Sequence, residues 1–430
     1  MDWRVLGFGL ALTVAVTLLF GLAPALRASA VKPASALKGG SDPHSRRRLM
    51  HALIAVQVAF CFLVLFAAGL FAATFDRLSN RPIGFSAERL LTLETVAQRA
   101  QPPVFWDQVA DHLRTVPGVE TVALAGWPLL GGGAWNGFVS VNGAPPGPVL
   151  AYFLNVSPGW IGAMKIPFIA GRDFHASDTS PGVAIVNETF AKQYFNGESP
   201  MGQSFAKGQD RYQVVGMVHD APYRSMREPI LPVAYVPFHS IDAKSALLPV
   251  SAGTFIVRTV SSNPLALAST LRREVPRARP EFRVSNIRTQ AELVRAQTVR
   301  ERLLAALALF FAAVALLLAG IGMYGVLDYS VLQRRREIGI RVAIGAQPAS
   351  IARLVTLDVF CTVLAGAVAG IALGLASMRY MEALLYEVKA NDPAMLALPS
   401  VTILAAALLA ALPAVIRAVR IDPVTMLRSE

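Results

Sequence analysis

The chain has few charged residues and almost no cysteine. Only 16% of its 430 residues are charged, whereas 54% are hydrophobic and the mean hydropathy is +0.48. This composition is too apolar for an ordinary soluble domain. The two cysteines, Cys61 and Cys361, both lie inside apolar runs. We therefore expect no disulfide and predict that each cysteine packs as a small hydrophobic residue.

Motifs of catalysis and of nucleotide or metal binding are missing. No G-x-x-x-x-G-K-[ST] phosphate-binding loop occurs, because Gly202 and Gly208 are one residue too far apart. The six histidines form no H-E-x-x-H zinc pair. The S-x-x-K match at 204–207 lacks the further elements that accompany it in penicillin-recognising enzymes. The chain is predicted to be no enzyme, with no cofactor and no metal, so any ATP hydrolysis would come from a partner.

Five apolar runs are each long enough to cross a membrane, which takes roughly 20 residues. They cover 5–22, 52–73, 303–327, 359–378 and 395–416. The first run follows Arg4, as the core of a signal peptide would, but it is longer than such a core and ends in Pro24-Ala25-Leu26-Arg27. We therefore favour a membrane span there and predict five transmembrane helices.

Basic residues orient these spans, because Lys and Arg in short loops remain on the cytoplasmic side. The linker 28–49, the loop after the third run and the C-terminal tail are basic, whereas the link 379–393 is slightly acidic. Five crossings, with the N-terminus outside and the C-terminus cytoplasmic, put all three basic segments inside. Much of the net charge of +12 thus serves to orient the membrane spans. No aromatic residues alternate with these basic residues, so we expect no nucleic-acid partner.

Residues 76–300 have the composition of a soluble domain and are long enough to bury a core. Strand, helix and strand patterns follow one another at 90–96, 103–116 and 119–125, and again at 254–259, 264–275 and 282–287. Between them, about 152–238 is interrupted by Gly and Pro and holds a strand pattern at 214–218. The predicted fold class is membrane α-helical, with a large extracytoplasmic α+β domain made of a split layer and an inserted subdomain.

These patterns give a domain organisation. The predicted segments are a transmembrane helix in 1–27, a basic cytoplasmic linker 28–49, a transmembrane helix in 50–75, the extracytoplasmic domain 76–300 and a permease domain 301–430 with transmembrane helices at 303–327, 354–378 and 395–416. Gly366, Gly370 and Gly374 form a ridge of small residues at helical spacing in the fourth span. Such a ridge suits close helix packing, either within the chain or in a dimer.

One loop combines charge with apolar surface in a way that topology alone does not require. It reads Gln333-Arg334-Arg335-Arg336-Glu337-Ile338-Gly339-Ile340-Arg341-Val342-Ala343-Ile344-Gly345-Ala346. The arginines suffice to keep it cytoplasmic, so the isoleucines favour a docking surface for a cytoplasmic protein. The residues predicted to form this surface are Arg334, Arg335, Arg336, Glu337, Ile338, Gly339, Arg341, Gly345 and Ala346. Glu337 and Arg341 stand one turn apart and can pair.

Two segments of the chain are similar to each other. Segments 22–38 and 412–428 each end an apolar run with a Pro, an Arg, and a second Pro followed four residues later by Leu and a basic residue. Membrane helices often end in Pro and Arg, which is the ordinary explanation. The alternative is that the first span is the last helix of an earlier copy of the same unit, so that the chain begins partway through a duplicated protein.

Four sequence blocks resemble the permeases of the MacB/FtsX superfamily of ABC transporters, and the resemblance covers the chain from residue 50 to the C-terminus. They are the loop 334–346, the block 156–160 with 166–167 and 171–174, the block 183–191, and the block 214–220 with 235–237. The chain is most similar to the tandem-duplicated branch called acidobacterial duplicated orphan permeases. The family unit has four helices, so the run 5–22 is surplus and resembles the last helix of an upstream unit. In the family, His219 and Asp220 fall at a structural turn.

The resemblance implies a permease subunit of the bacterial inner membrane that works by mechanotransmission. A cytoplasmic ABC ATPase would bind the loop 334–346, and a continuous helix from 294 to 327 would carry its movement to the extracytoplasmic domain. The implied cargo is a hydrophobic compound, a peptide or a lipoprotein. The implied partners are a second copy or a homologous permease unit, and an envelope protein. The alternative is an FtsX-like regulator or sensor that transports nothing.

Overall fold

The computed structural model of the chain divides into two compact units. The described residues are 43–334, 337, 338, 340, 341, 344, 347–381, 384–388 and 393–419, with isolated positions at 3, 7, 10 and 14. The membrane unit comprises residues up to 66, 311–378 and those from 393 onward, and the core unit comprises 67–310 and 379–392. Most of the predicted first span and linker, and the end of the tail, lie outside the described residues.

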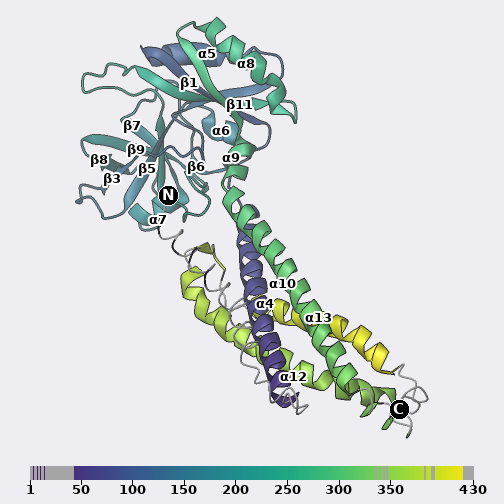
Figure 1. The fold of residues 1–430 in the computed structure, drawn as a ribbon. Coiled ribbons are helices and arrows are strands. Elements are labelled where there is room, and N and C mark those ends of the chain that lie inside the picture. Colours follow the sequence, from purple (N-terminus) through teal and green to yellow (C-terminus); the bar gives the residue numbers. More distant parts are fainter. Residues whose placement is uncertain are drawn as a thin grey trace. The chain divides into compact units, whose positions relative to one another are not determined.

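Four helices of the described residues are long and apolar enough to cross a membrane. They are α4 (Pro43–Ser79), α10 (Val299–Gln333), α12 (Pro348–Met381) and α13 (Pro393–Val419) (Figure 1). The second to fifth predicted spans are therefore confirmed as apolar helices, and the span at 5–22 stays a prediction. Nearly continuous runs of Leu, Ala, Val and Phe make these helices apolar around their whole circumference, as expected of segments with lipid or other helices on every side.

Three of these helices contribute residues to both units, although α12 contributes only residues 379–381 to the core unit. Helix α4 has 37 residues and α10 has 35, so at the usual helical rise each extends more than about 50 Å. That exceeds the hydrocarbon core of a bilayer, which is about 30 Å thick. Residues 67–79 of α4 and 299–310 of α10 belong to the core unit. Neither helix is interrupted where it passes from one unit to the other.

The first half of the core unit is an antiparallel layer with strand order β12-β1-β11-β2. Its elements are β1 (Leu90–Gln101), α5 (Pro103–Arg114), β2 (Val119–Ala125), β11 (Val250–Thr259), the 3-10 turn η2 (Pro264–Leu267), α8 (Ala268–Ala278) and β12 (Phe282–Thr289). The six strand and helix patterns predicted here are confirmed. The two strand-helix-strand units interleave, because β11 lies between β1 and β2 while β1 lies between β11 and β12.

Alternate residues of these strands face two different cores, as the two-residue period of a strand requires. Leu91 and Leu93 of β1 pack in one cluster with Trp106 of α5 and Leu271 of α8. Leu90, one position away, belongs to the second cluster on the other face of the layer. Helices α5 and α8 thus cover one face, and their apolar stripes explain why they fold against it.

The second half of the core unit continues the same sheet through a single residue pair, Ala125 with Val156. Its strands are β3 (Asn136–Phe138), β4 (Ser140–Val141), β5 (Leu150–Val156), β6 (Phe168–Gly171), β7 (Gly182–Asn187), β8 (Ser204–Lys207), β9 (Asp210–Val218) and β10 (Val233–Pro237), with the short helices α6 (Trp160–Met164) and α7 (Glu188–Tyr194). Strands β3 and β4 precede residue 152. The strands between the two predicted strand-helix-strand units thus begin earlier in the chain than the Gly and Pro breaks indicated.

The helix predicted to run without interruption from 294 to 327 is broken. Helix α9 (Gln290–Ala296) ends before a turn at Gln297 and Thr298, and α10 begins at Val299. The amide of Gln297 donates to the carbonyl of Val294, a three-residue step that tightens the last turn of α9. The prediction was wrong here because neither Gln nor Thr is a helix breaker, so the sequence carries no stop signal.

Candidate functional site

The described part of the loop after α10 forms a short helical segment. The amide of Ile338 donates to the carbonyl of Arg334 at 2.9 Å, and that of Ile344 donates to Ile340 at 3.1 Å. Glu337 and Arg341 form an ion pair of 2.8 Å across one turn, with both side chains about half exposed. Arg335, Arg336, Gly339, Gly345 and Ala346 of the predicted docking surface lie outside the described residues.

The three isoleucines of this segment divide between two environments. Ile338 is fully buried, and its side chain anchors the segment. Ile340 is 49% exposed and Ile344 is 81% exposed. These two stand four residues apart, beside the Glu337–Arg341 pair, and present apolar surface next to balanced charge. We call Glu337, Ile340, Arg341 and Ile344 the outer face of the loop.

The glycine ridge of α12 lies against α4. A Cβ atom added at Gly366 would stand 2.7 Å from the carbonyl oxygen of Ala55, and one added at Gly370 would stand 2.6 Å from the Cβ of Phe62. At Gly374 the nearest atom, in the ring of Phe66, would be 3.1 Å away. The absence of side chains is what allows the two helices to approach this closely.

Polar contacts that sequence reasoning missed also join helices of the membrane unit. Arg417 of α13 donates to Asp328 of α10, and its other terminal nitrogen donates to the hydroxyl of Tyr324 at 3.3 Å. His51 of α4 and Thr362 of α12 are hydrogen-bonded at 2.8 Å. The available signal was an ionisable or polar residue inside or at the end of an apolar run, which usually has a partner on a neighbouring helix.

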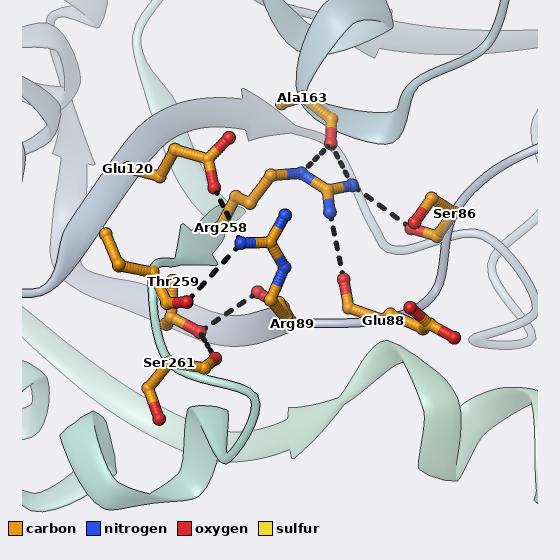
Figure 2. A network of polar contacts seen from close by, with 9 residues as sticks. Ser86, Glu88, Arg89, Glu120, Ala163, Arg258, Thr259 and Ser261 are labelled. Carbon is orange, nitrogen blue, oxygen red and sulfur yellow. Dashed lines mark hydrogen bonds and ion pairs between the residues drawn. The ribbon is translucent and has the colours of Figure 1, made fainter.

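In the core unit, Arg258 of β11 fixes the chain segment that follows α4 (Figure 2). This side chain is only 1% exposed. It donates to the carbonyl of Ala163 at 2.6 and 2.8 Å, to that of Glu88 at 2.9 Å and to that of Ser86 at 3.2 Å. Burial lowers the pKa of Arg258, while Glu120 acts in the opposite direction. The guanidinium therefore joins β11, α6 and residues 86–88 in one polar contact.

A second arginine contact lies where α10 begins. The Nη2 of Arg227 donates to the carbonyl of Leu384 at 2.7 Å, and its Nε stands 3.4 Å from Glu301. Arg81, just after α4, donates to the carbonyls of Met226 and Glu228, the latter at 3.0 Å. The segment 384–388, which lies between α12 and α13, thus contacts the same part of the core unit as the start of α10.

The turn between α9 and α10 is tied to another loop of the core unit. Gln290 donates to the carbonyl of Leu129 at 2.8 Å, and Gln297 donates to that of Leu130 at 3.1 Å. Leu129 and Leu130 are buried, and Leu130 has a positive φ of 61°. The two glutamines therefore hold the base of α10 against an apolar loop.

His219 and Asp220 contact the first turn of α7, whose N-cap is Asn187. Asp220 accepts from the amide of Thr189 at 3.0 Å and from its hydroxyl at 2.7 Å, which satisfies the first turn of α7. His219 lies 3.2 Å from Glu188 in the same turn. Among the described residues, no group of three or more His, Cys, Asp or Glu side chains is placed to hold a metal ion.

Two family models match the chain. The one described as MacB-like periplasmic core domain matches residues 52–273, and the one described as FtsX-like permease C-terminal matches residues 309–423. The first covers α4 from Ala52 and most of the core unit, and the second covers α10 to α13.

Relatives are similar over part of their length. The macrolide export ATP-binding/permease protein MacB of Rhodospirillum rubrum is 29% identical over 226 residues, which are 51% of this chain and 34% of that protein. The pyoverdine export ATP-binding/permease protein PvdT of Pseudomonas entomophila is 27% identical over 271 residues, 61% of this chain and 41% of that protein. The chain thus spans only about a third to two fifths of the length of these relatives.

Among solved structures, the periplasmic region of MacB from Actinobacillus actinomycetemcomitans is 12% identical, with a TM-score of 0.35. It matches 51% of this chain and 97% of that one. The family models carry the assignment, since one of them alone covers about half of the sequence. This chain, with its apolar membrane helices and its large α/β unit, belongs to the family of MacB/FtsX-type membrane permeases.

Proposed function

We propose that the chain is the permease subunit of a MacB/FtsX-type ABC system that works by mechanotransmission. The observation that carries the proposal is the continuity of α4 and α10, each an unbroken helix with residues in both units. A rigid helix can transmit a displacement of one end to the other. The proposal places the protein in the bacterial inner membrane, with the core unit and the N-terminus outside and the C-terminus in the cytoplasm.

ATP hydrolysis is assigned to a partner. The sequence contains no phosphate-binding loop, whereas the relatives are named as combined ATP-binding and permease proteins. The proposed contact with the ATPase is the outer face of the loop, formed by Glu337, Ile340, Arg341 and Ile344. Its exposed isoleucines supply the apolar surface and its ion pair supplies polar specificity.

The proposed activity is export or extraction of a hydrophobic compound, a peptide or a lipoprotein. The relatives named for macrolide and pyoverdine export support this class of cargo. The permease is proposed to act as a homodimer or together with a homologous permease unit, and to meet an envelope protein outside the membrane.

The test is co-purification from native membranes followed by mass spectrometry. Ile344→Asp puts a charge on the outer face, and Leu247→Asp, at a residue 44% exposed in the core unit, is the matched control. An ATPase should accompany the parent and Leu247→Asp but be lost from Ile344→Asp. If the parent brings down only external proteins and Ile344→Asp behaves the same, the coupling proposal fails and the regulator or sensor alternative takes its place.

A further inference from the structure

We propose that Arg227 is a positioning residue that fastens the segment 384–388, between α12 and α13, to the base of the core unit. Under the proposed function, on which this consequence rests, the core unit is then driven from three points of attachment instead of two. The first two are α4 and α10, which continue into the unit. The third is the segment 384–388, which follows the end of α12 and is held by side-chain contacts.

The segment is packed into the core unit, although it is short and connects two membrane helices. Tyr386 is only 9% exposed and belongs to the same buried cluster as Leu78 at the end of α4 and Phe85 just after it. The guanidinium of Arg81 lies over the ring of Tyr386 at 5.7 Å, and Arg77 donates to the carbonyl of Glu387. A loop with no role in the core unit would not bury a tyrosine there.

Arg227 joins this segment to the start of α10. One nitrogen donates to the carbonyl of Leu384 at 2.7 Å while another stands 3.4 Å from the carboxylate of Glu301. Glu301 is only 5% exposed, and its Oε2 is buried with no hydrogen-bond partner among the described residues. A buried carboxylate is costly unless a cation accompanies it, so Arg227 supplies the countercharge of Glu301 and holds Leu384 at the same time.

The contact is suited to arginine and to no other cation. A guanidinium has five donors in a fixed plane and can serve two acceptors in different directions, whereas an ammonium is a compact point charge. Arg81 supports the arrangement from the opposite side, because it binds the carbonyls of Met226 and Glu228 on either side of Arg227. Residues 226–228 are therefore the place where the segment after α4, the first turn of α10 and the segment after α12 meet.

Hydrogen exchange on the full chain in lipid nanodiscs tests the attachment without any partner. Arg227→Gln removes the charge, and Arg224→Gln is the matched control, since Arg224 pairs with Glu228 at 2.7 Å and has no bond to the segment. In Arg227→Gln the amides of 384–388 and of the first turn of α10 should exchange about tenfold faster or more. The core strands should keep their protection. Equal protection of 384–388 in both variants would overturn the proposal.

A charge-reversed pair separates the two bonds of Arg227. In Arg227→Glu with Glu301→Arg the ion pair can form again, but a carboxylate cannot donate to the carbonyl of Leu384. Protection should return to the first turn of α10 while 384–388 stays fast. If both regions recover, Leu384 is not held by Arg227 and the proposal is wrong. This variant also answers the objection that a buried, unpaired Glu301 simply prevents folding.

Coupling is measured with the partner ATPase present, as transport per ATP hydrolysed in proteoliposomes. Arg227→Gln should still bind the ATPase and hydrolyse ATP but transport several-fold less per ATP, whereas Arg224→Gln should match the parent. A parent that binds no ATPase contradicts the proposed function, while the exchange result stands by itself. A parent and Arg227→Gln with equal coupling would show that the attachment has no part in transmission.

Discussion

The core unit and the membrane unit are each stabilised in a different way. In the core unit, large side chains such as Trp106, Trp160 and Phe255 are completely buried within one continuous sheet and its helices. Among the membrane helices, 44% of an apolar stretch of 18 residues is buried in α4 and 33% in α12. The buried share of such a stretch is only 17% in α10 and in α13. The core unit therefore buries its apolar side chains within itself, whereas α10 and α13 leave most of their surface to lipid or to another chain.

The difference follows from the solvent around each unit. In water, burial of apolar surface drives folding at roughly 25 cal/mol per Å². In a bilayer the lipid tails are as apolar as leucine, so helices associate through close packing and hydrogen bonds instead. Close packing of the described membrane helices occurs at Gly366 and Gly370 of α12, and polar contacts such as Arg417 with Asp328 join α13 to α10.

The largest effect is expected in the core unit, from Trp106→Ala. The indole packs against Phe238, Phe255 and Phe282, with ring centroids 4.6 to 6.0 Å apart. Its removal leaves a cavity and should lower the free energy of unfolding of the core unit by about 3 to 5 kcal/mol. Denaturant unfolding followed by intrinsic fluorescence measures this. Val104→Ala, on the exposed side of the same helix, should change it by less than about 0.5 kcal/mol.

The next effect belongs to the membrane unit and comes from Gly370→Leu. Since even a Cβ at this position would stand 2.6 Å from Phe62, a leucine must push α12 away from α4. Overpacking of this kind costs about 1 to 3 kcal/mol. The thermal transition of the chain in detergent should fall, whereas Gly325→Leu, where nothing lies within 4 Å, should leave it in place. Equal behaviour of the two variants would contradict the glycine ridge as a packing surface.

The same comparison explains how much the sequence could predict. Apolar runs gave four described membrane helices, and alternating patterns gave β1, β2, β11 and β12 with their helices, because period and length are local properties. The single continuous sheet was not predictable, since it depends on the pairing of Ala125 with Val156, which no local pattern encodes. The turn at 297–298 was not predicted for a related reason, because it is fixed by hydrogen bonds from Gln290 and Gln297 to a distant loop.

The candidate sites show the same limit. The charge and the isoleucines of the loop after α10 were readable, but the burial of Ile338, unlike Ile340 and Ile344, is a property of packing. Arg227 and Arg258 stand in stretches with no motif, and both donate to backbone carbonyls, up to 172 residues away. A side chain that binds carbonyls leaves no complementary residue in the sequence, so contacts of this kind become visible only in the structure.

A smaller effect is expected at the start of α9, the helix that leads to α10. Thr289 accepts from the amide of Glu292, and Glu292 accepts from the amide of Thr289, which makes a complete capping box. Thr289→Ala should lower the free energy of unfolding of the core unit by about 1 kcal/mol. Thr289→Ser keeps the hydroxyl and should restore most of it. If serine is as poor as alanine, the cap is not what stabilises this turn.

The smallest effect concerns a charge pair at the edge of the core unit and depends on pH. Burial tends to raise the pKa of Asp178, but the hydrogen bond from Arg172 at 2.7 Å and the amide of His175 outweigh it and lower that pKa. A carboxylate whose pKa is lowered by folding stabilises the native state above its unfolded pKa of about 4 and loses this contribution as the pH falls through the folded value.

Arg172→Gln should therefore reduce the free energy of unfolding at pH 7 by less than about 1 kcal/mol, because the arginine is 39% exposed and solvent screens the pair. The difference from the parent should shrink as the pH is lowered below about 4, where the carboxylate is protonated in the unfolded chain and progressively in the folded one. Denaturant unfolding at a series of pH values measures it. A difference that stays constant down to pH 2 would mean that Arg172 stabilises the loop through its bond to the carbonyl of Asp173 at 2.8 Å instead of through the charge of Asp178.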